Sequence, residues 1–155
     1  MVYIGIDPGK AGGYSIIYHE TDSSADLVEC FCWDEQGFID KISELAKTYG
    51  SNYIITCVEL VHSMPTDSHK VAFSFGYQNG FIKAILLNYK IPYQEISPQK
   101  WKKEFNLIKK SKDEAIEVCQ NLYPLVSLYR TPRCKKRSDG MAESLLMATY
   151  AKRHL

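Results

Sequence analysis

The chain has no apolar run long enough to cross a membrane and few cysteines for cross-links. Across 155 residues, no apolar stretch reaches the roughly 20 residues that a membrane-spanning helix needs. The cysteines are odd in number, scattered, and contain no C-x-x-C pair: Cys30, Cys32, Cys57, Cys119 and Cys134. This pattern predicts reduced thiols, as in a cytoplasm, and argues against a disulfide framework or a zinc site. Met1 leads directly into a strand pattern, so we expect no signal peptide.

The sequence also has almost no net charge, but this balance hides two halves of opposite sign. The formal net charge is +1, from 19 Lys and Arg against 18 Asp and Glu. Residues 1–97 carry 6 basic and 12 acidic side chains, a balance of −6, whereas residues 98–155 carry 13 and 6, a balance of +7. A basic half suggests a polyanionic partner, and a solvated basic surface explains the composition about as well.

The apolar pattern predicts one α/β domain covering residues 1–155, because the chain has no linker, repeat or low-complexity segment. Segments 2–7, 14–18 and 27–33, joined by short turns that include 22–24, predict an antiparallel meander. The other predicted elements are strands at 53–59 and 91–96 and helices at 36–49, 71–89, 98–101, 112–122 and 139–153. We therefore expect a mixed five-stranded sheet, three antiparallel strands followed by parallel ones, with helices on both faces.

Two of the predicted strands end in a carboxylate. The first strand ends on Asp7, just before Pro8-Gly9, and the continuous apolar run YIITCVE ends on Glu59. The predicted helical crossover before the second of these strands makes the two neighbours, because consecutive elements tend to lie adjacent. Both acids then lie at strand ends, where open α/β sheets place their sites. Either acid alone is as well explained as a turn cap or a surface residue.

The last predicted helix adds two more acids, Asp139 and Glu143. They are four residues apart and share a helix face with Ala142 and Leu146, the face expected to pack on the sheet. Like charges at this spacing repel, and a core-facing carboxylate is unfavourable unless a cation offsets it. Each acid alone is an ordinary helix residue. Together with Asp7 and Glu59 they point to a divalent metal, and Mg²⁺ prefers such oxygen ligands.

The three acidic blocks, in this order and spacing, resemble the RuvC group of Holliday-junction resolvases within the RNase H-like superfamily. The blocks are GIDPG at 5–9, VE at 58–59 and SDGMAESLLMATY at 138–150. The resemblance extends over nearly the whole chain, including IPYQEISPQKWKK at 91–103, and the version is similar to the phage-encoded branch. It implies an RNase H-like fold and a cytoplasmic protein of a bacterial cell.

The resemblance also implies a junction-selective endonuclease with two metal ions, Mg²⁺ or else Mn²⁺, which leaves 5′-phosphate and 3′-hydroxyl ends. By motif, Asp7 would bridge both ions, and Glu59, Asp139 and Glu143 would complete the two sites. Two such ions can activate a water and stabilise the leaving oxygen of a phosphodiester. Many relatives carry His or Asp three residues before the last acid, where this chain has Gly140. The departure leaves the separate roles of Asp139 and Glu143 open.

The excess positive charge is concentrated in two runs, KWKKEFNLIKKSK at 100–112 and RTPRCKKR at 130–137. The second run leads directly into Asp139, so we predict that both runs contact DNA phosphates near the carboxylates. Lys10, just after the Asp7 turn, either reaches a phosphate or is a plain surface residue. The predicted DNA-binding residues are Lys10, Lys100, Lys102, Lys103, Lys109, Lys110, Lys112, Arg130, Arg133, Lys135, Lys136 and Arg137.

The predicted helix at 71–89 carries more apolar residues than one sheet face needs, so part of its surface is either additional core or an interface. Gly76 and Gly80 permit close approach of another helix. A four-way junction presents two equivalent strands, which a two-fold dimer would match, and the resemblance implies a homodimer as well. We predict an interface that includes Phe73, Tyr77 and Phe81.

The loop at 60–69 is the region with which relatives probe the open centre of a junction, often through an aromatic residue. This loop contains no aromatic residue. Either His62 or Met64 replaces the aromatic residue as the probe of the junction centre, or the loop only connects two elements.

Other activities fit parts of the pattern. An actin-like or sugar-kinase-like ATPase also opens with a strand ending in Asp and a Gly-rich turn, but such proteins need two superfamily domains, which 155 residues cannot supply. An RNase H acting on RNA–DNA hybrids would cleave hybrids and ignore branching. A non-catalytic junction-binding protein would show no metal-dependent nicking, and the presence of all four carboxylates argues against it.

Overall fold

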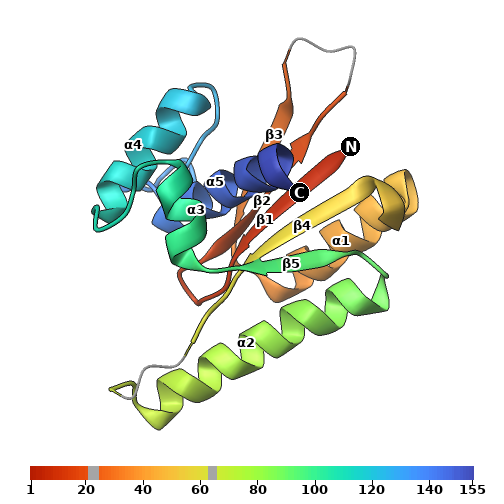
Figure 1. The fold of residues 1–155 in the computed structure, drawn as a ribbon, viewed down its shortest axis with the longest axis horizontal. Helices are drawn as coiled ribbons and strands as arrows, with labels where there is room; N and C mark the ends of the chain where they lie inside the picture. Colours follow the sequence, from red (N-terminus) through yellow and green to blue (C-terminus); the bar gives the residue numbers. More distant parts are fainter. Residues whose placement is uncertain (21–24, 63–65) are drawn as a thin grey trace.

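The computed structural model describes residues 1–20, 25–62 and 66–155. The strands are β1 (Val2–Asp7), β2 (Gly13–Tyr18), β3 (Leu27–Cys32), β4 (Ile54–Glu59) and β5 (Tyr93–Ile96). The helices are α1 (Glu35–Tyr49), the short 3-10 helix η1 (Ser51–Tyr53), α2 (His69–Asn88), α3 (Pro98–Glu104), α4 (Lys112–Leu122) and α5 (Asp139–His154). Figure 1 shows their arrangement, with the chain running from red to blue.

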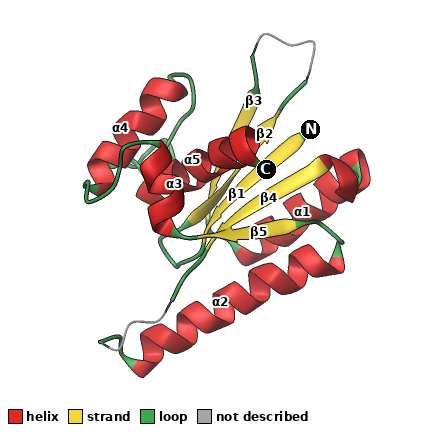
Figure 2. Cartoon of the chain, in the orientation of Figure 1, coloured by secondary structure: helices red, strands yellow, loops and turns green. Residues whose placement is uncertain are grey.

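The five strands form one sheet in the order β3-β2-β1-β4-β5. Strands β1, β2 and β3 pair antiparallel, whereas β4 pairs parallel with β1 and β5 pairs parallel with β4. Helices lie on both faces of this sheet (Figure 2). The mixed five-stranded α/β sheet predicted from the sequence is therefore confirmed.

Alternation along the strands divides the core into two layers. Val2, Ile4 and Ile6 of β1 are fully buried in one cluster, together with Phe38 of α1 and Ile82 of α2. Tyr3 faces the other cluster, which is built from α3, α4 and α5. Because successive side chains of a strand point to opposite faces, a single apolar strand contributes to both layers.

Helix α5 lies directly on β1, and Gly5 permits this approach. A Cβ atom at Gly5 would lie 2.0 Å from the carbonyl oxygen of Ser144 and 2.3 Å from the amide nitrogen of Ala148. No side chain fits that space, so glycine is required by the backbone of the helix that crosses it. The helix is buried from Gly140 to Ala151.

Capping residues account for most of the helix boundaries. Ser111 and Glu114 form the predicted capping box at the start of α4, and α3 begins at Pro98 after Ser97, also as predicted. Helix α2 begins two residues earlier than predicted, because the Ser68 hydroxyl accepts a hydrogen bond from the amide of Val71.

Strand β5 is shorter than the predicted 91–96. The amide of Ile91 donates to the carbonyl of Leu86, which completes the end of α2. Pro92 has no amide hydrogen, so pairing with β4 starts at Tyr93. Helix α3 extends beyond the predicted residue 101 to Glu104.

The remaining predictions concern the cysteines, membrane-spanning helices and two loops. All five cysteines are free. No described helix combines the length and apolar character needed to span a bilayer. His62 is exposed, whereas Met64 and the turn predicted at 22–24 lie outside the described residues.

Candidate active site

The four predicted carboxylates come from three elements that meet at one edge of the sheet. Asp7 ends β1 and Glu59 ends β4, and these parallel strands are paired up to Ile6 and Val58. Asp139 and Glu143 lie in the first turns of α5, which pack against the turn that follows β1. The structure therefore brings together four acids that are distant in the sequence, two from adjacent strand ends and two from the helix that crosses them.

The electrostatics of Asp7 reflect this gathering of negative charge. Burial raises the pKa of Asp7 well above its usual range, and the charges of Glu59, Glu143 and Asp139 raise it further. Burial also raises the pKa of Glu59, with Glu143 adding to the effect. A carboxylate cluster of this kind is unfavourable at neutral pH unless positive charge offsets it.

Two lysines supply part of that offset. The ammonium group of Lys102 in α3 lies 3.1 Å from Oε1 of Glu143, a residue that is only 7% exposed. Lys112, at the start of α4, pairs with Asp139. Although burial acts in the opposite direction, this pairing keeps the pKa of Asp139 below its usual value. Both lysines were predicted to contact DNA, and in the structure both contact acids of the site.

Trp101 is the site residue that the sequence pattern did not reveal. Its indole N–H donates to Oε1 of Glu59 over 2.9 Å, and its ring is fully buried beneath α3. The ammonium group of Lys102 lies 5.1 Å from the centre of the same ring. The place of Trp101 in a short helix after a strand predicts that its side chain is buried. No local sequence signal identifies Glu59 as its hydrogen-bond acceptor.

Within residues 1–20, 25–62 and 66–155, no group of three or more His, Cys, Asp or Glu side chains is arranged to hold a metal ion. The donor set nevertheless has the chemistry that Mg²⁺ or Mn²⁺ requires, because all four candidate ligands are carboxylates. Burial is the main reason that the pKa of Asp7 is raised, and the charges of Glu59, Glu143 and Asp139 add to it; a divalent cation would offset those charges. The residues therefore fit the metal predicted from the sequence.

Gly140, three residues before Glu143, is packed too closely to carry a side chain. A Cβ atom at Gly140 would lie 2.4 Å from the carbonyl oxygen of Ala11 and 2.7 Å from two backbone atoms of Gly12. The first turn of α5 thus lies against the backbone of the turn after β1, and this position admits no side chain. The preceding residue, Asp139, carries the carboxylate that pairs with Lys112.

The turn after Asp7 is held from two sides. Within the turn, the amide of Gly12 donates to the carbonyl of Gly9 over 2.9 Å, and Gly9 has a φ of +146° that other residues rarely adopt. From α2, the side chain of Gln78, only 6% exposed, donates to the same carbonyl over 3.2 Å. The position of Asp7 therefore depends on α2 as well as on the sheet.

Basic residues of the 130–137 loop lie near this edge of the molecule. Lys110 pairs with Glu114 over 2.9 Å, and Arg130 donates to the carbonyl of Ala11 in the turn after β1. A cavity of about 400 Å³ joins the 130–137 loop to Asp139. The predicted DNA-binding residues that form no ion pair within the described chain are Lys10, Lys100, Lys103, Lys109, Arg130, Arg133, Lys135, Lys136 and Arg137.

The predicted interface residues follow one another along one side of α2 but differ in exposure. Phe73 and Tyr77 are 78% and 55% exposed. Phe81 is half-buried, with its ring 6.2 Å from Trp33 and 6.3 Å from Tyr77. It therefore connects the core to the exposed side of the helix.

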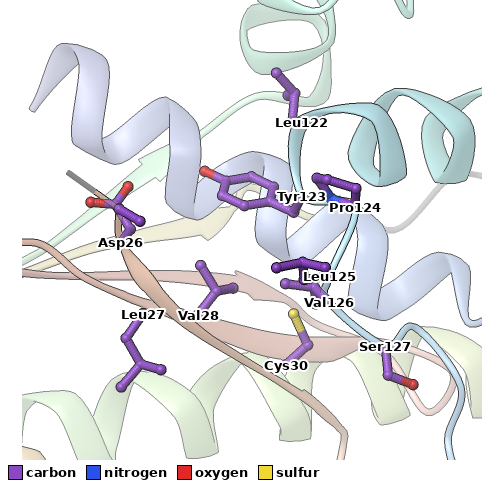
Figure 3. Close-up of a pocket in the computed structure, with 11 residues that line it drawn as sticks. Asp26, Leu27, Val28, Cys30, Leu122, Tyr123, Pro124, Leu125, Val126 and Ser127 are labelled. Atoms are coloured by element: carbon purple, nitrogen blue, oxygen red, sulfur yellow. The ribbon is translucent and has the colours of Figure 1, made fainter.

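A different cavity, of about 620 Å³, lies far from the carboxylates. It is formed by the edge of β3 and the segment after α4 (Figure 3). Its wall includes Asp26, which pairs with Lys152 near the end of α5, over three turns of helix away from Asp139. Cavity size therefore does not locate the candidate active site in this protein.

Comparison of the sequence with protein-family models and with curated proteins gave no match. Comparison of the structure with solved structures gave matches over almost the whole chain. Thermus thermophilus RuvC in complex with a Holliday junction substrate has 18% identity and a TM-score of 0.63, covering 99% of this chain and 97% of that one. Another Thermus thermophilus RuvC structure has 19% identity and a TM-score of 0.59, with coverages of 99% and 96%.

The yeast mitochondrial Holliday junction resolvase Ydc2 is also similar, with 17% identity, a TM-score of 0.51, and coverages of 98% and 83%. At identities this low, the likeness establishes a shared fold. The chain therefore has the RNase H-like fold of RuvC, as the acidic blocks in the sequence implied.

Proposed function

We propose that the protein is a structure-selective endonuclease that resolves Holliday junctions and other branched DNA by hydrolysing phosphodiester bonds with two divalent metal ions. The observation that carries this proposal is the meeting of Asp7, Glu59, Asp139 and Glu143 at one edge of the sheet. It is supported by the RuvC fold, since one similar structure is RuvC in complex with a Holliday junction substrate. We take residues 1–155 as one nuclease domain.

Asp7, Glu59, Asp139 and Glu143 would hold the metal ions, which we propose to be Mg²⁺, with Mn²⁺ as a substitute. When bound, such ions supply Lewis-acid chemistry that activates water and stabilises a leaving oxygen, here the 3′ oxygen, so that 5′-phosphate and 3′-hydroxyl ends result. Three other carboxylates act on Asp7, so Asp7 would be one of the residues that hold the ions.

Lys102 and Lys112 neutralise two of the carboxylates in the metal-free protein. Each lysine side chain remains partly exposed, at 32% and 69% respectively. Both ammonium groups therefore lie at the boundary between the acids and the solvent-facing basic surface. From there they can contact the phosphate groups beside the bond that is cut.

The DNA-binding surface would consist of basic residues that have no acidic partner among the described residues, on α3, the segment before α4, and the 130–137 loop. Arg130 and the cavity beside Asp139 link this surface to the carboxylates. Each phosphate that the protein neutralises releases counterions, so affinity should fall steeply with salt. Base-specific contacts are not needed for the recognition of a branched shape.

A homodimer would place two such sites on the two equivalent strands of a junction. Exposed α2 residues occur at a heptad-like spacing of four and three: Phe73, Tyr77, Gly80, Ala84 and Leu87. A helix packs against a second copy of itself through such a seam, and Gly80 allows close approach. We therefore propose α2 as the dimer interface, with Phe81 supporting it from the core side.

Free thiols agree with a reducing compartment, and we propose the cytoplasm of a bacterial cell. The similarity of the acidic blocks to the phage-encoded branch makes a phage gene the proposed source.

The test compares three labelled substrates: a four-way junction, a linear duplex of the same sequence and an RNA–DNA hybrid. Each is incubated with and without Mg²⁺, and the products are resolved on a sequencing gel. We expect paired nicks near the junction centre that need Mg²⁺ and can be religated. Asp7→Asn should abolish cleavage while junction binding remains. Cleavage of the hybrid without regard to branching would indicate an RNase H, and binding without nicking would indicate a junction-binding protein.

A further inference from the structure

We propose that Trp101 is a positioning residue for Glu59. In this arrangement, the indole N–H engages one oxygen of the Glu59 carboxylate, so that the other oxygen is directed to the carboxylate cluster as a metal ligand. The proposal rests on the proposed function, because Glu59 is one of the four carboxylates assigned there to the metal ions.

The contact itself is specific. The indole nitrogen of Trp101 is a donor only, and it lies 2.9 Å from Oε1 of Glu59. The Trp101 side chain is fully buried, and a buried indole N–H that lacks an acceptor is unfavourable. An ionised carboxylate is a strong acceptor, so the bond is charge-assisted. This hydrogen bond therefore limits the rotation of both side chains.

The chain path brings Trp101 to Glu59. Ile96, the last residue of β5, is paired with Glu59, and the amide of Leu60 donates to the carbonyl of Ile96 over 2.9 Å. Helix α3 then begins at Pro98 and returns Trp101 over the end of β4 within its first turns. The side chain of Trp101 is thus carried by a rigid connection to the strand that neighbours Glu59.

The same helix reaches a second carboxylate of the site. Lys102, the next residue, lies over the Trp101 ring and pairs with Glu143 of α5 over 3.1 Å. Two adjacent residues of α3 therefore contact acids on β4 and on α5. Trp101 differs from Lys102 in carrying no charge, so it orients its carboxylate without competing electrostatically with a metal ion.

Groups that hydrogen-bond to metal ligands usually change metal affinity or activity by about 10–100-fold when they are removed. The informative substitution is Trp101→Phe, which keeps an aromatic ring in the core and removes only the N–H donor and part of the ring volume. We expect it to weaken Mn²⁺ and Mg²⁺ binding by about 10–100-fold, measured by isothermal titration calorimetry on the full chain without DNA.

Trp33 provides a matched control, because the chain has only two tryptophans. Its ring packs 5.1 Å from Phe38 and 6.2 Å from Phe81, on the other face of the sheet. Trp33→Phe should leave metal affinity unchanged. The two indole N–H signals are also separable in a ¹H–¹⁵N spectrum of the wild-type protein, where each is assigned from the spectrum of the matching variant.

In that spectrum, addition of Mg²⁺ should move the Trp101 indole signal and leave the Trp33 signal in place. Glu59→Gln should move the Trp101 signal in the absence of metal. Because the chain has two tryptophans, Trp33→Phe alone assigns both signals, so these two measurements decide the proposal even if Trp101→Phe unfolds. If the Trp101 signal moved neither on addition of Mg²⁺ nor in Glu59→Gln, the proposal would be overturned.

The outcomes also separate this inference from the proposed function. If wild-type protein cleaves junctions and Trp101→Phe binds metal with unchanged affinity, the positioning role is refuted while the nuclease stands. If wild-type protein neither binds Mg²⁺ or Mn²⁺ nor cleaves a junction, both are refuted. Weaker metal binding by Trp101→Phe, with an unshifted Trp33 signal that reports an intact fold, would support both.

Discussion

Replacing Gly140 with alanine should both destabilise the protein and impair cleavage. A Cβ atom at this position would lie 2.4 Å from the carbonyl oxygen of Ala11, whereas real Cβ atoms essentially never approach a heavy atom closer than 3.0 Å. The first turn of α5 must therefore retreat by about 0.6 Å. Since α5 is also held against β1 at Gly5, it cannot move freely as a rigid body.

The magnitude follows from the contacts. Overpacking costs about 1–3 kcal/mol, and three backbone contacts below 3.0 Å place Gly140→Ala near the upper value. The better helix propensity of alanine offsets about 1 kcal/mol of this. The net loss of about 2 kcal/mol corresponds to a fall of about 4–8 °C in Tm for a chain of this size. Asp139 moves with the helix, and because a 1 Å misplacement can lower a rate about 100-fold, we expect cleavage to fall at least ~10-fold.

Thermal unfolding and junction cleavage measure the two effects. Gly76→Ala in α2 is the matched control, because a Cβ atom there would meet nothing within 4 Å. That variant should keep wild-type stability or gain up to about 1 kcal/mol. If Gly140→Ala were as stable as Gly76→Ala and cleaved junctions at the wild-type rate, the packing argument for Gly140 would be wrong.

Three further predictions concern charge and assembly. The pKa of Asp7 is raised in the folded protein, so folding favours the protonated carboxyl. This stabilisation of the metal-free protein is complete below the unfolded pKa of about 3.9 and is lost as the pH rises through the folded pKa. In EDTA, Tm should therefore fall over this window in the wild type and less in Asp7→Asn; equal pH profiles would contradict this. Tyr77→Glu should convert the dimer to monomers in analytical ultracentrifugation with little change in the fold, because Tyr77 is exposed; a persistent dimer would place the interface elsewhere. Arg133→Gln should reduce the slope of log K against log salt for junction binding by about 0.9 with the circular dichroism spectrum unchanged, and an unaltered slope would remove Arg133 from the DNA contacts.

Local sequence patterns were sufficient to predict most of the architecture. A β-branched apolar run bounded by Pro8-Gly9 marks β1, and the continuous apolar run before Glu59 marks a strand covered on both faces. Ser111 and Glu114 mark the start of α4 through a capping box. These signals act between residues that are close in the sequence, so they can be recognised before the chain is folded. Where a prediction was wrong, as at the start of β5, a neighbouring proline and the end of a helix shifted the boundary.

Helix α1 joins β3 to β4, which are not neighbours in the sheet, so the adjacency of consecutive elements does not by itself place β4 beside β1. That Asp7 and Glu59 each end a strand, where α/β sheets place their sites, could still be predicted. The roles of the nearby lysines could not. Lys102 and Lys112 belong to basic runs that resemble a DNA-binding surface, yet the structure pairs them with Glu143 and Asp139. A charge pattern gives the number of lysines but not the direction in which each side chain points.

The amino-acid sequence by itself determined the strands, the helices, the acids at their ends and the basic second half of the chain. Only the tertiary structure decided that Trp101 would meet Glu59, that the first turn of α5 would leave no room for a side chain at Gly140, and that Gln78 of α2 would support the turn after Asp7. The physical reason is distance along the chain. Contacts between residues 42 or 69 positions apart depend on how whole elements pack, and packing is set by the summed shape of many side chains.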